Sequence, residues 1–266
     1  IVRSSSLLED NFGTSFAGKY DSFFCPNQGT PEKNLEALLR AISMVYASIF
    51  SPDALFYRQQ MGLLDYDERM AILLQEVQGE RHGDHFFPTL AGVAFSHNPF
   101  RWTSKIRPDD GFLRMVWGMG TRAVDRVAND YPRMVALSHP DLRPEIGAAQ
   151  IRRYSQRSVD LINLRENRFE TRSVAELLDM EFPSARLLVS VDRGDYLQPP
   201  PAYDPNLSPR DLILSFDGLL TKTGFVPLMK TILGTISERF GRHVDVEFTA
   251  DIVPGYPQPE FAIQAA

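Results

Sequence analysis

Val244-Asp245-Val246-Glu247-Phe248-Thr249 is the stretch that decides the fold, because apolar and polar side chains alternate along it. A period of two is typical of a β-strand with one buried and one exposed face. Residues 254–259 contain three prolines and a glycine, which predict a turn. A second strand is expected at Phe261-Ala262-Ile263-Gln264. The sequence therefore predicts a closing antiparallel hairpin.

Three helical regions are predicted upstream of this hairpin. Residues 211–240 have helical periodicity, and Gly241 is expected to cap their C-terminal end. A second helix is expected from Pro31 to Phe50, with Thr30 as its N-cap and one apolar face. The residues of that face are Leu35, Leu38, Leu39, Ile42, Val45 and Ile49. A shorter helix is predicted from Pro52 to about Met61, with Ala54, Leu55 and Tyr57 inward.

Apolar runs between turn residues predict the remaining strands. A buried strand is expected at 71–77, and further strands are expected at 90–96, 112–117, 159–164 and 187–190. The polar segment 79–89 is predicted to be a loop. Strands and helices in this mixed order indicate an α+β domain with antiparallel hairpins.

Composition excludes several classes of protein. The 266 residues allow one large domain or two small ones. A net charge of −6 and a pI near 5.4 argue against a nucleic-acid-binding protein. No run of ~20 apolar residues is present, so no membrane partner is expected. The single cysteine, Cys25, excludes a disulfide framework and favours a cytoplasmic setting.

Polar residues near the start of the chain could hold phosphate. Arg3 is followed by three serines, and Ser15, Gly18 and Lys19 lie in a second polar segment. A guanidinium beside hydroxyls and bare backbone suits phosphate oxygens. From these residues alone, a helix N-cap and a glycine turn are the favoured alternative.

The closing hairpin carries a candidate metal site. Asp245 and Glu247 face the same side of one strand, and Gln264 lies on the next strand. A carboxylate and an amide oxygen can hold Mg²⁺, which takes few protein ligands and completes its octahedron with phosphate and water. A half-exposed strand with solvated acids is the alternative.

Gln75-Glu76-Val77 ends a predicted buried strand, where backbone groups could contact an adenine edge. A simple strand end is the alternative. Gly118-Met119-Gly120 after a strand is weak evidence for a phosphate-facing turn.

The histidines point to no site in the sequence. His82 and His85 suggest a metal cluster, yet a solvated loop is favoured because no further ligand has suitable spacing. His97, His139 and His243 are isolated in the sequence. No G-x-S-x-G elbow or paired Cys/His triad is present, so a hydrolase is not favoured.

Several short segments, in this order, resemble one family. They are Val2-Arg3-Ser4-Ser5, Ser15-Phe16-Ala17-Gly18, Tyr57-Arg58, Leu74-Gln75-Glu76-Val77, Gly92-Val93-Ala94-Phe95-Ser96-His97-Asn98-Pro99, Trp117-Gly118-Met119-Gly120, Asp245-Val246-Glu247-Phe248 and Ile263-Gln264. Together they are similar to the pyruvate/phosphoenolpyruvate-binding, ATP-grasp module of phosphoenolpyruvate synthase and pyruvate phosphate dikinase.

The resemblance implies an ATP-grasp fold, in which two α+β lobes hold ATP and Mg²⁺. It implies that Arg3 contacts ATP phosphates and has the catalytic role. The segment with Ser15, Gly18 and Lys19 corresponds to the mobile glycine loop. Gln75, Glu76 and Val77 correspond to the adenine-contacting hinge. Glu247 and Gln264 correspond to the metal ligands.

The resemblance also implies an activity and a domain organisation. In the family, a phosphoryl group passes from ATP to a histidine on a separate swivelling domain, and from there to pyruvate. Residues 1–75 are expected to be the remainder of a first, incomplete lobe and its helices. Residues 76–266 are expected to be the second lobe, with a divergent insert near 143–209. The chain is thus expected to be part of a larger enzyme and inactive alone.

Departures from the family pattern leave alternatives open. Ala266 stands where the family usually has arginine, and the family's upstream segment with a phosphate-binding lysine has no counterpart within residues 1–266. None of the five histidines has the Gly-x-Thr-x-His context of a phosphoacceptor. One alternative is a non-catalytic regulatory or interaction remnant. Another is a related phosphotransferase with a glucan or an antibiotic as acceptor.

Overall fold

The computed structural model describes residues 1–10, 19–98, 100–124 and 129–265. Two compact units can be distinguished. Unit 1 comprises Ile1–Val77, Arg81–Phe86 and Ile162–Glu170, and unit 2 comprises Gln78–Glu80, Phe87–Leu161 and Thr171–Ala266. Among the described helices, none has both the length and the hydrophobicity that crossing a bilayer requires.

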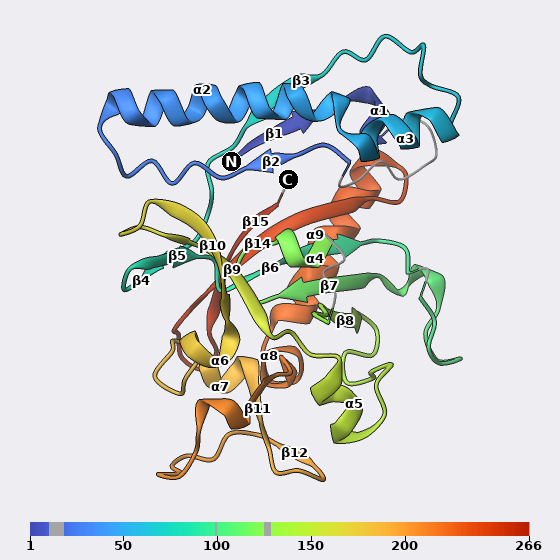
Figure 1. The fold of residues 1–266 in the computed structure, drawn as a ribbon. Coiled ribbons are helices and arrows are strands. Elements are labelled where there is room, and N and C mark those ends of the chain that lie inside the picture. The colour runs from blue at the N-terminus through green and yellow to red at the C-terminus, as the bar shows by residue number, and fades with distance from the viewer. Residues whose placement is uncertain (11–18, 99, 125–128, 266) are drawn as a thin grey trace. The chain divides into compact units, whose positions relative to one another are not determined.

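Unit 1 is built on a small antiparallel sheet with strand order β2-β1-β3. Its strands are β1 (Val2–Ser5), β2 (Ser22–Phe23) and β3 (Ala71–Leu74). The short helix α1 (Leu7–Asp10) follows β1, and the long helix α2 (Pro31–Ala47) lies along the sheet (Figure 1). A 3₁₀ turn, η1 (Ser48–Phe50), leads into α3 (Pro52–Gln60).

The predicted cap at Thr30 is confirmed, and Ser51 caps the next helix. Thr30 Oγ1 accepts a hydrogen bond from Lys33 N at 3.4 Å, and Ser51 Oγ accepts one from Ala54 N at 3.2 Å. These caps satisfy amide donors that have no partner within the helix. Arg58, on α3, is buried and donates to the carbonyl oxygens of Leu63, Leu64 and Tyr66. It therefore organises the loop after α3.

Three predictions of burial in unit 1 are wrong. Leu35 and Leu39 are 56 % and 55 % exposed, because α2 packs through the narrower stripe that contains Ala41 and Val45. Leu55 on α3 is also exposed. The predicted buried strand at 71–77 ends at Leu74 and is largely exposed, since β3 is the edge strand of its sheet.

Unit 2 contains a five-stranded antiparallel sheet with strand order β15-β14-β6-β7-β8. Its strands are β6 (Leu90–Phe95), β7 (Phe112–Val116), β8 (Arg133–Ala136), β14 (Asp245–Val253) and β15 (Glu260–Ala265). The predicted closing hairpin is confirmed, and β14 is longer than predicted. β8 has no counterpart among the predicted strands.

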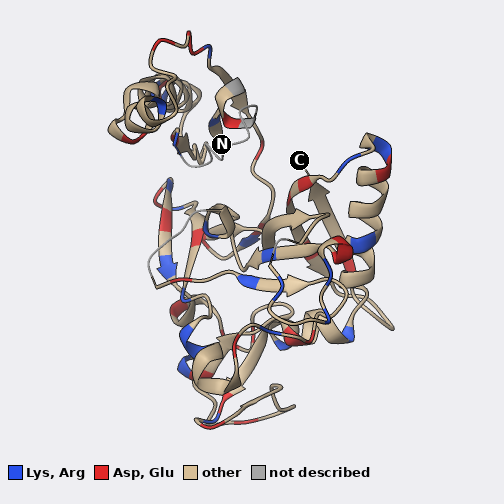
Figure 2. Cartoon of the chain, turned by 90° about the vertical axis from the view of Figure 1, so that its right-hand side faces the viewer, with Lys and Arg blue, Asp and Glu red and all other residues tan. Residues whose placement is uncertain are grey.

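Helix α9 (Phe225–Phe240) covers one face of this sheet. The Phe225 and Phe248 rings lie 6.4 Å apart between centroids, and Val246, Phe248, Ala250 and Ile252 of β14 are buried. Gly241 has φ 63° and caps the helix as predicted. Basic and acidic residues are interspersed along the ribbon of the chain (Figure 2).

A three-stranded sheet of order β12-β11-β13 forms the second part of unit 2. Its strands are β11 (Val189–Asp192), β12 (Leu197–Gln198) and β13 (Leu212–Leu214). The prediction of helix from residue 211 is wrong at its start. Leu212–Leu214 pairs with β11, and α8 (Asp217–Lys222) begins only after Phe216, whose φ is 58°. The apolar run Leu212–Leu214 is compatible with a helix or a strand, and pairing with β11 selects the strand.

The segment 79–89 is a hairpin and not the predicted loop. It contains β4 (Glu80–His82) and β5 (His85–Phe87), with Gly83 at φ 62° between them. Both strands belong to a sheet of order β10-β9-β5-β4 with β9 (Ser158–Asn163) and β10 (Arg168–Ser173).

The remaining short elements lie in the connections. They are α4 (Thr121–Val124), α5 (Gly147–Arg153), α6 (Val174–Leu177), α7 (Ala185–Leu188), η2 (Pro108–Asp110) and η3 (Pro209–Asp211). The mixed α+β architecture with antiparallel sheets that the sequence predicts is confirmed.

Candidate functional site

The predicted metal ligands lie on the face of the five-stranded sheet that α9 does not cover. Glu247 and Gln264 are both exposed. Gln264 is directly opposite Thr249, so Glu247 and Gln264 are diagonal neighbours on the same face. Such neighbours have Cα atoms about 7–8 Å apart, within reach of one cation through their side chains. The fold therefore brings the two predicted ligands together.

Two further features make this face suitable for a cation. Asp245 lies on the same face as Glu247 and adds a second carboxylate to that face. Gln264 Nε2 donates to Gln78 Oε1 at 2.9 Å, which leaves the amide oxygen of Gln264 as its acceptor group. Oxygen atoms from carboxylates and an amide are the ligands that Mg²⁺ prefers.

A partly exposed row of side chains crosses this face of the sheet. Glu247 is opposite Val93, Val93 is opposite Arg114, and Arg114 is opposite Met134. We call these four residues the open row. Ala91 and Val116 on one side of it are buried against Ala123 of α4. On the other side, Phe95 and Phe112 pack with ring centroids 5.7 Å apart.

Arg114 is a candidate that the sequence analysis did not single out. Arg114 is on β7, two strands away from β14, and it lies on the same sheet face as Glu247. Only the strand register places the two residues in one row, so spacing in the sequence contains no signal for it. A cation beside a carboxylate suits a phosphate that is also metal-bound.

Arg3 lies in the middle strand of the unit 1 sheet. Its Cα partners are Ser22 on β2 and Leu73 on β3, and its side chain is half-buried. Alternation along β1 puts Arg3 on the face opposite to the buried Val2 and Ser4. Lys19 is half-buried, whereas Ser15 and Gly18 lie outside the described residues.

The serines after Arg3 have structural partners. Ser4 Oγ donates to Glu9 Oε1 at 2.8 Å, and Ser6 Oγ accepts from Leu8 N at 3.0 Å and donates to Glu68. Ser6 therefore caps the start of α1, as the favoured alternative predicted. These two hydroxyls are engaged by the protein itself, which leaves Arg3 as the phosphate-binding candidate of this strand.

The predicted adenine hinge borders a cavity within unit 1. The cavity has a volume of about 700 Å³, and Gln75 and Glu76 line it together with aromatic side chains that include Phe24 and Phe169. The rings of Phe24 and Phe169 are stacked, with centroids 4.6 Å apart. The volume and the mixed apolar and polar lining are typical of small-molecule sites.

Part of the hinge backbone is already paired. Ile1 N donates to Gln75 O at 2.9 Å, and Gln75 N donates to Ile1 O at 3.0 Å. Gln75 thus extends the pairing of β1 with β3. Of the three predicted hinge residues, Glu76 and Val77 follow this pairing and are better placed to present backbone groups to a ligand.

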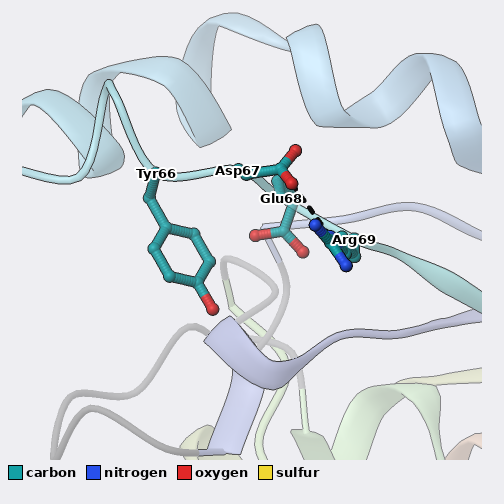
Figure 3. A pocket seen from close by; sticks show the side chains of 4 residues that line it. All are labelled: Tyr66, Asp67, Glu68 and Arg69. Carbon is teal, nitrogen blue, oxygen red and sulfur yellow. Dashed lines mark hydrogen bonds and ion pairs between the residues drawn. The ribbon is translucent and has the colours of Figure 1, made fainter.

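A second hollow of about 330 Å³ is lined by four consecutive residues, Tyr66–Arg69. Asp67 and Arg69 form an exposed ion pair at 2.8 Å (Figure 3). Glu68 accepts from Ser6 and, with burial, raises the pKa of Tyr20. The polar groups here hold unit 1 together, and this hollow is not our candidate for a nucleotide site.

The predicted phosphate role of Gly118-Met119-Gly120 receives little support. Met119 N donates to Asp160 O at 3.1 Å, and the Asp160 carboxylate accepts from Thr121 Oγ1 and Thr171 Oγ1, each at 2.6 Å. The turn amide is thus used within unit 2.

Comparison with known proteins decides the family. The family described as "Pyruvate phosphate dikinase, AMP/ATP-binding domain" matches residues 1–263. The chain belongs to this family. The description of this family names AMP and ATP binding, and the mixed α+β architecture of the chain is consistent with the family.

Curated relatives include a rifampicin phosphotransferase and phosphoenolpyruvate synthases. Rifampicin phosphotransferase of Streptomyces sviceus is 33 % identical over 53 % of this chain and 14 % of its own length. Phosphoenolpyruvate synthase of Escherichia coli is 30 % identical over 57 % of this chain and 18 % of its own length. A probable phosphoenolpyruvate synthase of Methanocaldococcus jannaschii is 30 % identical over 46 % of this chain and 9 % of its own length. The chain thus spans less than a fifth of these relatives.

In each unit, some of the predicted site residues belong to one sheet or directly follow one of its strands. Glu247, Gln264 and Asp245 share one sheet face in unit 2. In unit 1, Arg3 lies on β1, and Gln75 follows β3, which pairs with β1.

Proposed function

We propose that this chain binds ATP with Mg²⁺ and is the phosphoryl-donor module of a larger phosphotransferase. In that protein a phosphoryl group passes from ATP to a histidine on a separate swivelling domain, and then to pyruvate or another acceptor. The observation that carries the proposal is the common face of Glu247 and Gln264 on the five-stranded sheet. Membership of the AMP/ATP-binding family supports the nucleotide.

The sheet face that carries Glu247 and Gln264, which we call the open face, offers the oxygen ligands that Mg²⁺ prefers. Glu247 and Gln264 would hold the ion, with Asp245 beside them on the same strand face as Glu247. When bound, Mg²⁺ neutralises charge on the phosphates of ATP. The protein residues supply position: phosphoryl transfer needs aligned phosphates and compensated charge more than covalent chemistry from the protein.

Unit 1 contains the other residues that we propose for nucleotide binding. Arg3 would hold phosphate oxygens, because a guanidinium can donate two parallel hydrogen bonds to them. Glu76 and Val77 would contact the adenine edge, with the cavity beside Gln75 and Glu76 as the place for the ring. We also propose residues 1–75 as part of the first lobe and 76–266 as the second, with 143–209 as an insert.

Calorimetric titration with ATP and Mg²⁺ tests the proposal. Glu247→Gln keeps the shape and removes the charge, so ATP affinity should fall at least tenfold, or about 1.4 kcal/mol. Glu238→Gln, on the exposed surface of α9, is the matched control and should bind as the wild type does. An unchanged affinity in Glu247→Gln would remove the metal assignment. Loss of affinity in Glu238→Gln as well would show a general charge effect.

The identity of the acceptor is a separate part of the proposal. The relatives named above include both phosphoenolpyruvate synthases and a rifampicin phosphotransferase. Full-length protein assayed for ATP-dependent AMP release with pyruvate, rifampicin or a glucan separates these acceptors. Release with one of them supports an active module, and release with none supports the alternative of a regulatory remnant.

A further inference from the structure

Two histidines that are far apart in the sequence lie side by side in unit 2. His97 follows the end of β6, and His243 precedes the start of β14. Phe95 is opposite Asp245, so the histidine pair continues this register two residues beyond the ladder. Ser96 N donates to Val244 O at 2.9 Å, and the two imidazole centroids are 4.9 Å apart. The sheet itself therefore creates the pair.

A carboxylate from another segment joins them. Asp109 lies on η2, and its Oδ1 is 3.8 Å from Nδ1 of His97. Hydrogen bonds hold the η2 turn on both sides of Asp109. Asn98 N donates to Pro108 O at 2.6 Å, and the Asp110 carboxylate accepts from Arg107 N and from Ser138 Oγ, each at 2.7 Å. Asp109 is thus presented by a supported turn and not by a loose loop.

We propose that His97, Asp109 and His243 bind one divalent transition-metal ion of the Zn²⁺ class. One ligand atom from each residue lies within 4.8 Å of the others. Ligands about 2.0–2.1 Å from a tetrahedral Zn²⁺ are about 3.4 Å apart, so the set needs only small side-chain rotations. All three residues are exposed, which leaves room for those rotations and for water at the remaining position.

The ligand chemistry separates this ion from the Mg²⁺ of the proposed function. Imidazole nitrogen suits Zn²⁺, Cu²⁺ and Ni²⁺, whereas Mg²⁺ selects oxygen ligands. Two imidazoles and one carboxylate therefore favour the transition metals. The inference does not depend on nucleotide binding.

A neighbouring hydroxyl supports one histidine. Ser96 Oγ accepts from Val244 N at 2.8 Å and lies 3.5 Å from Nδ1 of His243. A hydrogen bond at one ring nitrogen orients the imidazole and leaves the other nitrogen for a metal. With His243 held in this way, Nε2 is its metal-binding atom. The bound ion links η2 to the start of β14.

Titration of the full chain with Zn²⁺, in the absence of nucleotide, tests this inference. Calorimetry should show one site, with affinity at least tenfold lower in His243→Asn and in Asp109→Asn. Zn²⁺ should also raise the melting temperature of the wild type with increasing concentration, because it binds only the folded arrangement of the three ligands. Co²⁺ should give visible absorption bands that His97→Asn removes.

Controls separate this site from the remaining histidines and from the nucleotide site. His85→Asn, on the hairpin of β4 and β5, should bind Zn²⁺ as the wild type does. Glu247→Gln should also keep Zn²⁺ binding, and excess Mg²⁺ should not displace the ion. Unchanged Zn²⁺ affinity in both His97→Asn and His243→Asn overturns the proposal, as does an equal loss in His85→Asn.

Discussion

The two faces of the five-stranded sheet in unit 2 are made by alternate residues of the same strands, yet they have different roles. On β14, Val246, Phe248, Ala250 and Ile252 are buried. Their neighbours Asp245 and Glu247 belong to the other face, where the open row crosses the sheet. One face is covered by α9 through its apolar side. The other face carries the carboxylates of Asp245 and Glu247, the amide of Gln264 and the guanidinium of Arg114.

Alternate residues of one strand therefore have different roles: those on the face covered by α9 stabilise the fold, and those on the open face are available to ligands. Burial of the covered face contributes to the free energy of folding. The open face keeps charged groups in fixed positions at the cost of less apolar burial. A change on the covered face should therefore affect folding first, and a change on the open face should affect binding first.

The largest expected effect is on the covered face. Phe248→Ala removes a ring that is 3 % exposed and packs against Phe225, so the free energy of unfolding should fall by about 3–5 kcal/mol. Urea denaturation measures it. Phe248→Leu should lose clearly less, because much of the volume is retained. A loss below about 1 kcal/mol in Phe248→Ala would mean that α9 does not pack as described.

A second change tests the spacing between strands. A Cβ on Gly92 would lie 2.1 Å from Arg114 O, closer than any real contact, so the backbones of β6 and β7 must shift. Gly92→Ala should lower the free energy of unfolding by about 1–3 kcal/mol and disturb the open row next to it. Urea denaturation checks the first effect, and calorimetry with ATP and Mg²⁺ checks the second.

Gly234→Ala, on α9, is the control for that change. Nothing lies within 4 Å of a Cβ there. It should stabilise the helix by about 0.5–1 kcal/mol without affecting ATP binding. Equal destabilisation in both variants would contradict the strand-spacing explanation.

The smallest expected effect concerns acid–acid repulsion near the far end of the open face. Burial and the Asp251 carboxylate raise the pKa of Glu80, so ionised Glu80 costs stability at neutral pH. Glu80→Gln should raise the free energy of unfolding by about 0.5 kcal/mol or less at pH 7, since Glu80 is exposed. The gain should shrink as the pH falls through the raised pKa and vanish below its ordinary value of 4.5.

Urea denaturation between pH 4 and pH 8 measures this profile, with Glu238→Gln as the control. A gain that grows toward low pH would have the wrong sign and would exclude the repulsion.

Predictions from sequence succeeded where a local pattern has one structural solution. The alternation around Glu247 predicts the closing hairpin, and Thr30 before Pro31 predicts the start of α2. Both signals are local: alternation selects a strand face, and a capping hydroxyl satisfies amides of its own helix. The family resemblance, based on short segments, is confirmed over residues 1–263.

Predictions failed where the deciding partner lies elsewhere in the chain. Leu212–Leu214 suits a helix or a strand, and pairing with β11 selects the strand. Leu35 and Leu39 have helical spacing, but only packing against β1 decides which leucines are buried. The hairpin at 80–87 was missed because its strands are short and rich in polar residues.

The sequence by itself determined the α+β class, the family and the residues of the nucleotide-site hypothesis, because these depend on residue types in short patterns. The tertiary structure alone decided which of them share a surface. Strand register aligns Glu247 with Val93 and Arg114, and it brings His97 beside His243. Register is a property of paired strands, since it depends on hydrogen bonds between segments that are distant in the chain.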